Sequence, residues 1–426
     1  MVIRKNRLYL FLATIFLLAD CRLFYLVPLP SFLAGAGSNK ALAGIISLMV
    51  FIIFACTSLE KFKLGRFGGS IFFFLLFLFF QGYVEHLNYG YKFSSILFSI
   101  LPFFTLLMYF LFIRLFENNL VDFIRIAEKI ALILGVLLLL QLVYYDIYHS
   151  LWLHFTMSDW YTIYHPTAPG RFYSVAEGFI RVMPLLSMYL VLDENIPTQK
   201  TDYFSIVVLI LVIAFVDQSR IYLIATLISM LIMYASLNSS KISSGRFLGI
   251  IILILLASLV VIPKLQSIVS SLTDPSNGSN YARFGAISYY WSLMKSYWLT
   301  GLGIVIPDEY SQYYTLIKGP NGIYNFDDIG LFGILAAFGV IILIWYLTLL
   351  IRNFSTAKKV SDPYLKALSF GLLIQLLICV FTESYLDVPR LFALTITMSI
   401  ISVASYHSTS NDNDYERNSN VRNNNY

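Results

Sequence analysis

Long apolar runs recur along the whole chain, with short polar segments between them, and no other feature restricts the fold as strongly. Twelve of these runs are long enough to cross a hydrocarbon core of roughly 30 Å as helices. They cover about Leu8–Val27, Ala41–Leu59, Gly69–Tyr83, Ser95–Phe116, Ile126–Tyr145, Val175–Leu192, Tyr203–Val216, Ile221–Leu237, Phe247–Pro263, Ile329–Ile351, Tyr364–Thr382 and Leu391–Tyr406. Because the bilayer interior has no water for backbone N–H and C=O groups, each run must form a helix. We therefore predict an all-α polytopic membrane protein with about 12 transmembrane helices.

The composition agrees with this fold class. Of 426 residues, 58% are hydrophobic and only 12% are charged, which is too apolar a balance for a water-soluble protein. We predict that residues 1–406 form one polytopic transmembrane domain. Residues 407–426 are rich in Asn and Ser and poor in apolar side chains, so we expect them to form a disordered cytoplasmic tail.

Basic residues set the expected orientation, because cytoplasmic connections of membrane proteins carry an excess of Lys and Arg. The even-numbered connections and both termini hold 18 of the 29 basic residues, namely Arg4, Lys5, Arg7, Lys61, Lys63, Arg66, Arg114, Arg125, Lys129, Lys200, Lys241, Arg246, Arg352, Lys358, Lys359, Lys366, Arg417 and Arg422. We therefore place both termini in the cytoplasm. The net charge of +5 comes largely from these anchors and does not indicate a nucleic-acid partner.

Two long polar segments, 146–174 and 264–328, then fall outside the cytoplasm, and the second connects the ninth and tenth predicted helices. Both are rich in Tyr and Trp. Within the second segment, Tyr281–Leu302 is predicted to form an amphipathic helix along the membrane interface. Trp291 and Trp298 share a face of this helix and suit the headgroup zone.

Ionisable residues near the outer ends of the predicted spans are candidates for a site, because charge at membrane depth is costly and usually faces a cavity. Arg171 precedes the sixth span, where Glu177 and Arg181 follow at helical spacing on one face. Arg220 precedes the eighth span on the outer side, and a guanidinium there could bind phosphate oxygens bidentately. Simpler alternatives are that Arg181 reaches water beside Glu177 and that Arg220 pairs with Asp217.

Polar residues also gather in and after the predicted interfacial helix. Arg283 lies on that helix, and Asn325, Asp327 and Asp328 precede the tenth span. Capping and the helix dipole favour acids at a helix N-terminus and would explain one of them. Two acids and an Asn could instead position or deprotonate a sugar hydroxyl.

The last outer connection contains Glu383, Asp387 and Arg390. We interpret them mainly as a solvated ion-pair cluster, with a cavity-lining role as the alternative. The histidines of segment 146–174 lack the spacing of a zinc site, and the three cysteines form neither a metal-binding pattern nor a disulfide pair. We predict no metal and no cofactor.

The order and outer placement of these motifs resemble the O-antigen polymerase and O-antigen ligase superfamily, which includes bacterial exopolysaccharide and capsule repeat-unit polymerases. The matching residues are Arg171 with Glu177, Ser219-Arg220, Tyr281-Ala282-Arg283, Trp298, Gly301-Leu302-Gly303, Asn325-Phe326-Asp327, Gly330, Gly333 and Gly339. The resemblance covers the arrangement of the whole chain, and its motifs fall within residues 171–339.

The resemblance implies a membrane glycosyltransferase on the outer face of the bacterial cytoplasmic membrane. It would polymerise undecaprenyl-pyrophosphate-linked oligosaccharide repeat units without a nucleotide sugar or a metal. Its partners would be the lipid-linked donor and acceptor, membrane lipids, a flippase and a chain-length regulator.

The resemblance also assigns roles to residues. Arg171, Arg220 and Arg283 would bind the pyrophosphate and stabilise its charge as it leaves, and Trp298 and Asn325 would belong to the same substrate site. Glu177 or Asp327 would act as the base for the acceptor hydroxyl.

The chain departs from the family in two respects. No Gly follows Arg171 or Arg283 at the fixed distance of the arginine-rich motif found in some O-antigen polymerases, and residues 264–328 contain no His. The missing His favours a polymerase over a ligase. Three alternatives stay open: ligase-type glycan transfer, a lipid-linked oligosaccharide flippase, and a non-catalytic scaffold for polysaccharide assembly.

Overall fold

The computed structural model describes residues 2–21, 24, 41–58, 64–150, 152, 176–237, 278–305 and 311–406. These residues form helices and connections, and none of them lies in a β-strand. The α-helices are α1 (Val2–Asp20), α3 (Ala41–Ser58), α4 (Gly68–Tyr89), α5 (Phe93–Ile100), α6 (Met108–Tyr148), α8 (Glu177–Leu192), α9 (Lys200–Leu211), α10 (Arg220–Ala235), α12 (Gly278–Tyr297), α13 (Tyr314–Lys318), α14 (Gly330–Ala357), α15 (Pro363–Cys379) and a last helix over 391–406. Short 3₁₀ segments cover Leu101–Leu107, Asp327–Ile329 and Val388–Arg390, and a π-helical turn covers Val212–Val216.

Four helical segments are long and apolar enough to cross a membrane: Gly68–Tyr89, Phe93–Tyr148, Asp327–Ala357 and Val388–Tyr406. The second has 56 residues, and a straight helix of that length would measure roughly 84 Å. Its helical geometry breaks at Asn119, with φ −134° and ψ 31°. The predicted spans Ser95–Phe116 and Ile126–Tyr145 lie on either side of this break.

Most of the predicted spans coincide with described helices, which confirms the all-helical class for the described residues and is consistent with a membrane protein. The predicted span Phe247–Pro263 lies outside the described residues, as do most of segment 146–174 and the whole of 407–426. The count of twelve spans therefore stays a prediction. The helix expected over Tyr281–Leu302 is present as α12.

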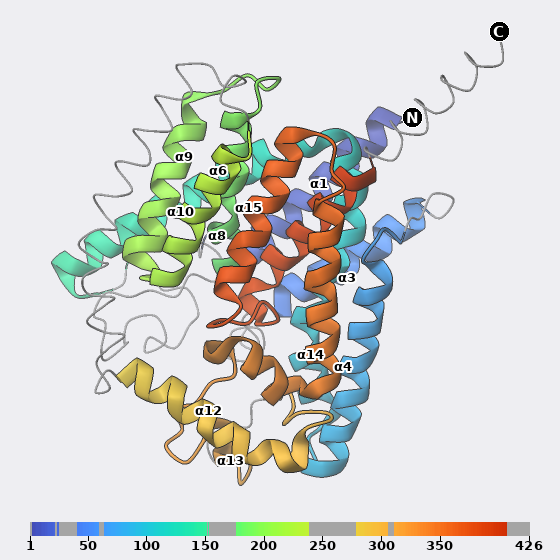
Figure 1. Cartoon of the computed structure of the whole chain (residues 1–426), viewed down its shortest axis with the longest axis vertical. Coiled ribbons are helices and arrows are strands. Elements are labelled where there is room, and N and C mark those ends of the chain that lie inside the picture. The colour runs from blue at the N-terminus through green and yellow to red at the C-terminus, as the bar shows by residue number, and fades with distance from the viewer. Residues whose placement is uncertain are drawn as a thin grey trace.

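Helix α8 lies at the centre of the bundle, and all of its residues are buried. A helix that is apolar on every side must pack on every side, and α8 contacts α6, α9, α10 and α15. Figure 1 shows α10, α15 and α6 around it. The one basic residue of α8, Arg181, is therefore surrounded by protein rather than by water or lipid.

Helix α12, α13 and the first part of α14 form a layer across one end of the bundle (Figure 1). This layer has its own small core, which contains Ala286, Tyr290 and Met294 from one face of α12. Helix α14 then bends at Gly339, where φ is +78°. The part after the bend, about 18 residues long, rises roughly 27 Å and runs along the bundle beside α4 (Figure 1).

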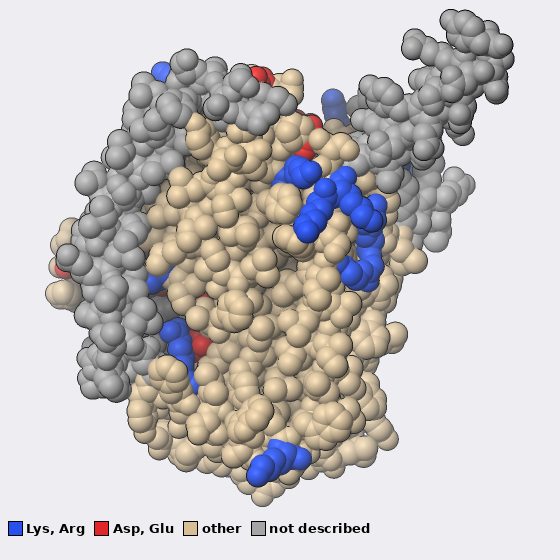
Figure 2. All heavy atoms as spheres, viewed as in Figure 1, with Lys and Arg blue, Asp and Glu red and all other residues tan. Residues whose placement is uncertain are grey.

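Basic side chains gather at the other end of the bundle. Figure 2 shows them over the upper ends of α14 and α15, far from the α12 layer. Arg352, Lys358 and Lys359 are exposed there. The predicted topology has this end facing the cytoplasm, and the orientation stays a prediction.

Candidate functional site

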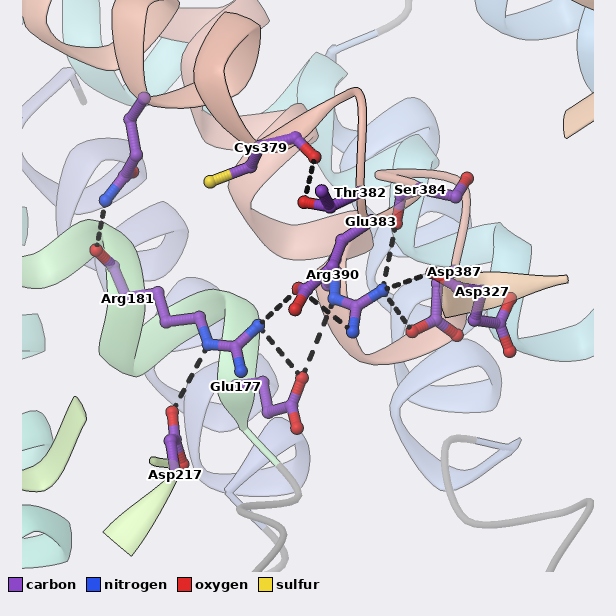
Figure 3. A network of polar contacts seen from close by, with 11 residues as sticks. Glu177, Arg181, Asp217, Asp327, Cys379, Thr382, Glu383, Ser384, Asp387 and Arg390 are labelled. Atoms are coloured by element: carbon purple, nitrogen blue, oxygen red, sulfur yellow. Dashed lines mark hydrogen bonds and ion pairs between the residues drawn. The ribbon is translucent and has the colours of Figure 1, made fainter. Parts of the chain in front are cut away.

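A buried network of ion pairs lies where α8, α10 and the segment after α15 meet (Figure 3). At its centre, the Arg181 guanidinium lies 3.2 Å from the carboxylates of Glu177 and Asp217 and 3.1 Å from that of Glu383. It also stacks over the Tyr222 ring, 3.9 Å from the ring centroid. Three acids and one aromatic face therefore hold a single cation away from water.

A second arginine, Arg390, extends this network. Its guanidinium lies 3.1 Å from Glu383, 3.0 Å from Asp387 and 3.7 Å from Glu177. It also donates to the backbone carbonyls of Asp327, at 3.3 Å, and Ser384, at 3.4 Å. Arg390 thus joins the end of α8 to the segments that precede α14 and the last helix (Figure 3).

The burial of these side chains corrects two expectations. Arg181 has only 2% of its side chain exposed, so it does not reach water beside Glu177. The side chains of Glu383 and Arg390 are each 8% exposed, so the cluster is not solvated. An Arg and a Glu near a helix end give the same sequence pattern whether the pair is exposed to water or buried. Only the tertiary packing decides which of the two occurs.

The network holds more negative than positive groups. Four carboxylates pair with two guanidiniums, so two negative charges would stay uncompensated if every acid were ionised. Burial and the charge of Asp327 raise the pKa of the Asp387 carboxyl well above its usual range, against the opposing effect of Arg390. Asp387 therefore holds its proton more tightly than an ordinary aspartate.

A cavity of about 160 Å³ opens beside this network. That is on the order of ten times the volume needed to hold one water molecule. Its lining combines polar groups and aromatic rings: Ser99, Pro102, Phe103, Gly303, Ile304, Phe326, Asp327, Gly333, Ala337, Phe338, Ser384, Leu386, Asp387 and Val388. Asp327 is exposed and Asp387 keeps 12% of its side chain accessible. We call the part formed by Asp327 and 384–388 the carboxylate wall.

Another part of the lining comes from two backbone segments that pack closely together. The N–H groups of Leu302 and Gly303 donate to the carbonyls of Ala336 and Ala337, at 2.8 and 3.0 Å. The N–H of Val340 donates to the Trp298 carbonyl at 2.8 Å, which caps the bend of α14. We call the part formed by Gly303, Ile304, Gly333, Ala337 and Phe338 the backbone wall.

Glycines permit this close contact between two chain segments. A Cβ on Gly301 would lie 2.4 Å from the Ala337 carbonyl, and one on Gly339 would lie 2.2 Å from the Leu299 carbonyl. Both residues also have positive φ, at +71° and +78°, which L-residues rarely adopt. Gly301-Leu302-Gly303 thus joins the end of α12 to the bend of α14.

The two predicted bases take different positions. Asp327 lines the cavity, whereas Glu177 is buried behind Arg390 and is absent from the described lining. Arg390 links them, through the Glu177 carboxylate and the Asp327 carbonyl. No side-chain cap is formed at the start of α14 or of the 3₁₀ turn Asp327–Ile329, so capping does not explain the acids there.

The predicted substrate-binding residues are dispersed. Arg171 lies outside the described residues. Arg220 is exposed at the first position of α10. Arg283 is half-buried on α12, and its Nε has no hydrogen-bond acceptor among the described residues. Trp298 is exposed after α12, and Asn325 accepts a hydrogen bond from Lys318.

The sequence predicts a cavity-lining role for Asp387 and Arg390 only as the alternative to a solvated cluster, and Asp387 does line the cavity. The sequence prediction gives no role to Gln81, inside the third predicted span, or to Glu85, two residues beyond its end at Tyr83. The detectable signal was an amide and an acid next to a long apolar run, since such residues at membrane depth are usually functional.

Within the described part of the chain, no group of three or more His, Cys, Asp or Glu side chains is arranged to hold a metal ion. The arrangement can bind hydroxyl groups, accept a proton at a carboxylate and stack a ring against aromatic side chains. No protein-family model and no curated protein matches the chain.

Proposed function

We propose that this protein polymerises undecaprenyl-pyrophosphate-linked oligosaccharide repeat units into a surface polysaccharide at the outer face of the cytoplasmic membrane. One observation carries the proposal. A cavity bordered by two carboxylates from separate segments, Asp327 and Asp387, lies at the end of an apolar helical bundle, with Arg390 behind them. We take this end to face outside the cytoplasm, as the basic residues of the sequence predict.

The cavity suits a sugar hydroxyl better than a pyrophosphate. Its described lining contains two carboxylates, two serines and no Lys or Arg, so an anionic group would be repelled there. Carboxylates accept hydrogen bonds from hydroxyl groups, and Phe103, Phe326 and Phe338 offer apolar faces to a ring. We therefore assign the cavity to the acceptor sugar.

The chemical step needs one base and one leaving group. A carboxylate of the cavity removes the proton of the acceptor hydroxyl as its oxygen bonds to the anomeric carbon of the donor. The bond from that carbon to the phosphate oxygen breaks, and undecaprenyl pyrophosphate leaves with the electron pair. A base must be ionised before it accepts a proton, so either cavity carboxylate, Asp327 or Asp387, can take this role at a pH above its own pKa.

The leaving pyrophosphate must be stabilised by cations outside the cavity. Arg220 and Arg283 are the candidates that the structure describes, and Arg171 is the third by resemblance to the family. Arg220 is exposed at the first position of α10, and the Nε of Arg283 has no acceptor among the described residues, so it can donate to a phosphate oxygen. Glu177, held by two arginines, keeps a supporting role in this scheme.

The test is extension of lipid-linked oligosaccharide by the purified, reconstituted protein, with the products separated by size. We expect Asp387→Asn and Asp327→Asn to lose most of the ladder of products, on the order of a hundredfold for a base. Arg283→Ala should weaken donor binding. Lys295→Gln, an exposed change on the same helix as Arg283, is the matched control and should extend normally.

Full-length ladders from both Asp variants would refute the proposal. Transfer of the glycan to a different acceptor, without extension, would identify a ligase instead.

The bend of α14 supports one competing function. Broken helices with backbone groups at a central cavity are typical of transporters, and a flippase for the same lipid-linked units would use them. Movement of the lipid-linked unit across proteoliposomes without extension would establish that alternative.

A further inference from the structure

Two polar residues on the candidate span α4 have no role in the chemistry described above. Gln81 and Glu85 are one turn apart on the same face of α4, and they are 1% and 2% exposed. Burying an amide and a carboxyl within an apolar helix is costly unless both are well bonded.

Glu85 holds the chain segment that follows α12. One carboxyl oxygen accepts the N–H of Ile304 at 2.9 Å, and the other accepts the N–H of Val305 at 3.1 Å. The fit leaves no free space, since a Cβ on Gly303 would lie 2.5 Å from the Glu85 carboxyl carbon. The segment is thus fixed to α4 at two consecutive amides.

Gln81 joins three elements at one point. Its Nε2 donates to the Thr300 carbonyl at 2.9 Å and to the Ala337 carbonyl at 2.6 Å. The first carbonyl belongs to the segment after α12, and the second lies two residues before the bend of α14. Both elements of the backbone wall are therefore bonded to α4.

We propose that Gln81 and Glu85 are positioning residues, which hold the backbone wall of the cavity at its distance from the carboxylate wall. This inference rests on the proposed function only in treating the cavity as the acceptor site. Neither side chain belongs to the described lining, so each acts through Gly303, Ile304 or Ala337.

Glu85→Gln is the most informative change, because it keeps the shape of the side chain. Glutamine has one acceptor oxygen, and its NH₂ group would face a second backbone N–H donor. We expect one of the two bonds to be lost and the segment 301–305 to open more often. Gln81→Leu removes both donated bonds and should act in the same direction.

The test uses a thiol placed in the cavity lining. Ser99→Cys is introduced with Cys56→Ser, since Cys56 is the exposed native cysteine and Cys21 and Cys379 are buried. The rate of labelling by a small thiol reagent is measured in the full-length reconstituted protein. We expect Glu85→Gln to raise this rate on the order of tenfold, which is the effect of losing one buried hydrogen bond.

Asn353→Ala is the matched control. Asn353 is also buried, but it donates to the Leu349 carbonyl of its own helix. Neither Asn353 nor Leu349 lines the cavity. This variant should lower stability without changing the labelling rate. In the extension assay, Glu85→Gln should raise KM for the lipid-linked acceptor more than it lowers kcat.

An unchanged labelling rate in both Glu85→Gln and Gln81→Leu would overturn the positioning role, whatever the extension assay shows. If Glu85→Gln is labelled faster but the protein without this change extends no glycan, the positioning role is supported and the proposed function is refuted.

Discussion

The carboxylate wall of the cavity is held by charged side chains, whereas the backbone wall is held by main-chain hydrogen bonds between closely packed segments. In the first, Arg181 and Arg390 connect four acids from three segments of the chain. In the second, Gly301 and Gly339 let two backbones approach within hydrogen-bonding distance. The carboxylate wall therefore depends on a balance of buried charges, and the backbone wall depends on glycines that have no side chain.

This difference determines what each wall tolerates. A buried ion network is disrupted by removing one partner, because the remaining charges stay buried and unpaired. A glycine junction tolerates loss of charge but not the addition of one carbon, because the neighbouring backbone cannot rotate away. The two walls can therefore be perturbed separately.

Arg181→Met should give the largest effect. It keeps the apolar bulk of the side chain and leaves Glu177, Asp217 and Glu383 with one cation fewer. We expect the free energy of unfolding to fall by about 3–5 kcal/mol, measured by thermal unfolding in detergent.

Arg114→Met is the matched control for that change. Arg114 also pairs with a glutamate on its own helix, Glu117, but its side chain is 30% exposed. We expect a loss of about 0–1 kcal/mol there. Equal losses in the two variants would show that Arg181 is not held by a buried network. Adding Glu383→Gln to Arg181→Met should recover part of the stability.

Gly339→Ala should give the next largest effect, on the backbone wall. The new Cβ would meet the Leu299 carbonyl at 2.2 Å, at a residue with φ of +78°. We expect a loss of about 2–4 kcal/mol from strain and clash together. Circular dichroism and thermal unfolding would measure it.

Gly69→Ala is the control, because nothing lies within 4 Å of a Cβ at that position of α4. It should be neutral or slightly stabilising. A Gly339→Ala protein as stable as Gly69→Ala would contradict the close approach of α14 and the segment after α12.

The two walls also differ in how far the sequence predicts them. The apolar runs predict the helices, because hydropathy and length are local properties. The i, i+4 spacing of Glu177 and Arg181 predicts their ion pair, which is present at 3.2 Å. The other two acids that contact Arg181, Asp217 and Glu383, come from distant segments. No local pattern predicts that these segments meet the start of α8.

The backbone wall was harder to predict. Gly301-Leu302-Gly303 is a weak sequence signal, because many glycines serve in turns without a close contact. The need for glycine at position 301 becomes visible only when α14 bends against it at Gly339. Likewise, Glu85 has a role only because two amides from residues far along the chain, Ile304 and Val305, point toward it.

Asp387→Asn should have the smallest effect on stability, and its signature is a pH dependence. Burial and the charge of Asp327 raise the pKa of Asp387 in the folded protein. The folded state then binds the proton more tightly than the unfolded state, so this carboxyl supports folding at low pH. Its contribution is lost as the pH rises through the folded-state pKa. Asparagine cannot titrate, so the melting temperature of the variant should rise relative to that of the wild type from pH 5 to pH 8.

Asp122→Asn, an exposed change on α6, serves as the control and should follow the wild-type profile. A gap between Asp387→Asn and wild type that stays constant with pH would mean that Asp387 remains ionised beside Arg390. Asp387 would then carry its negative charge, as a base must, throughout this pH range.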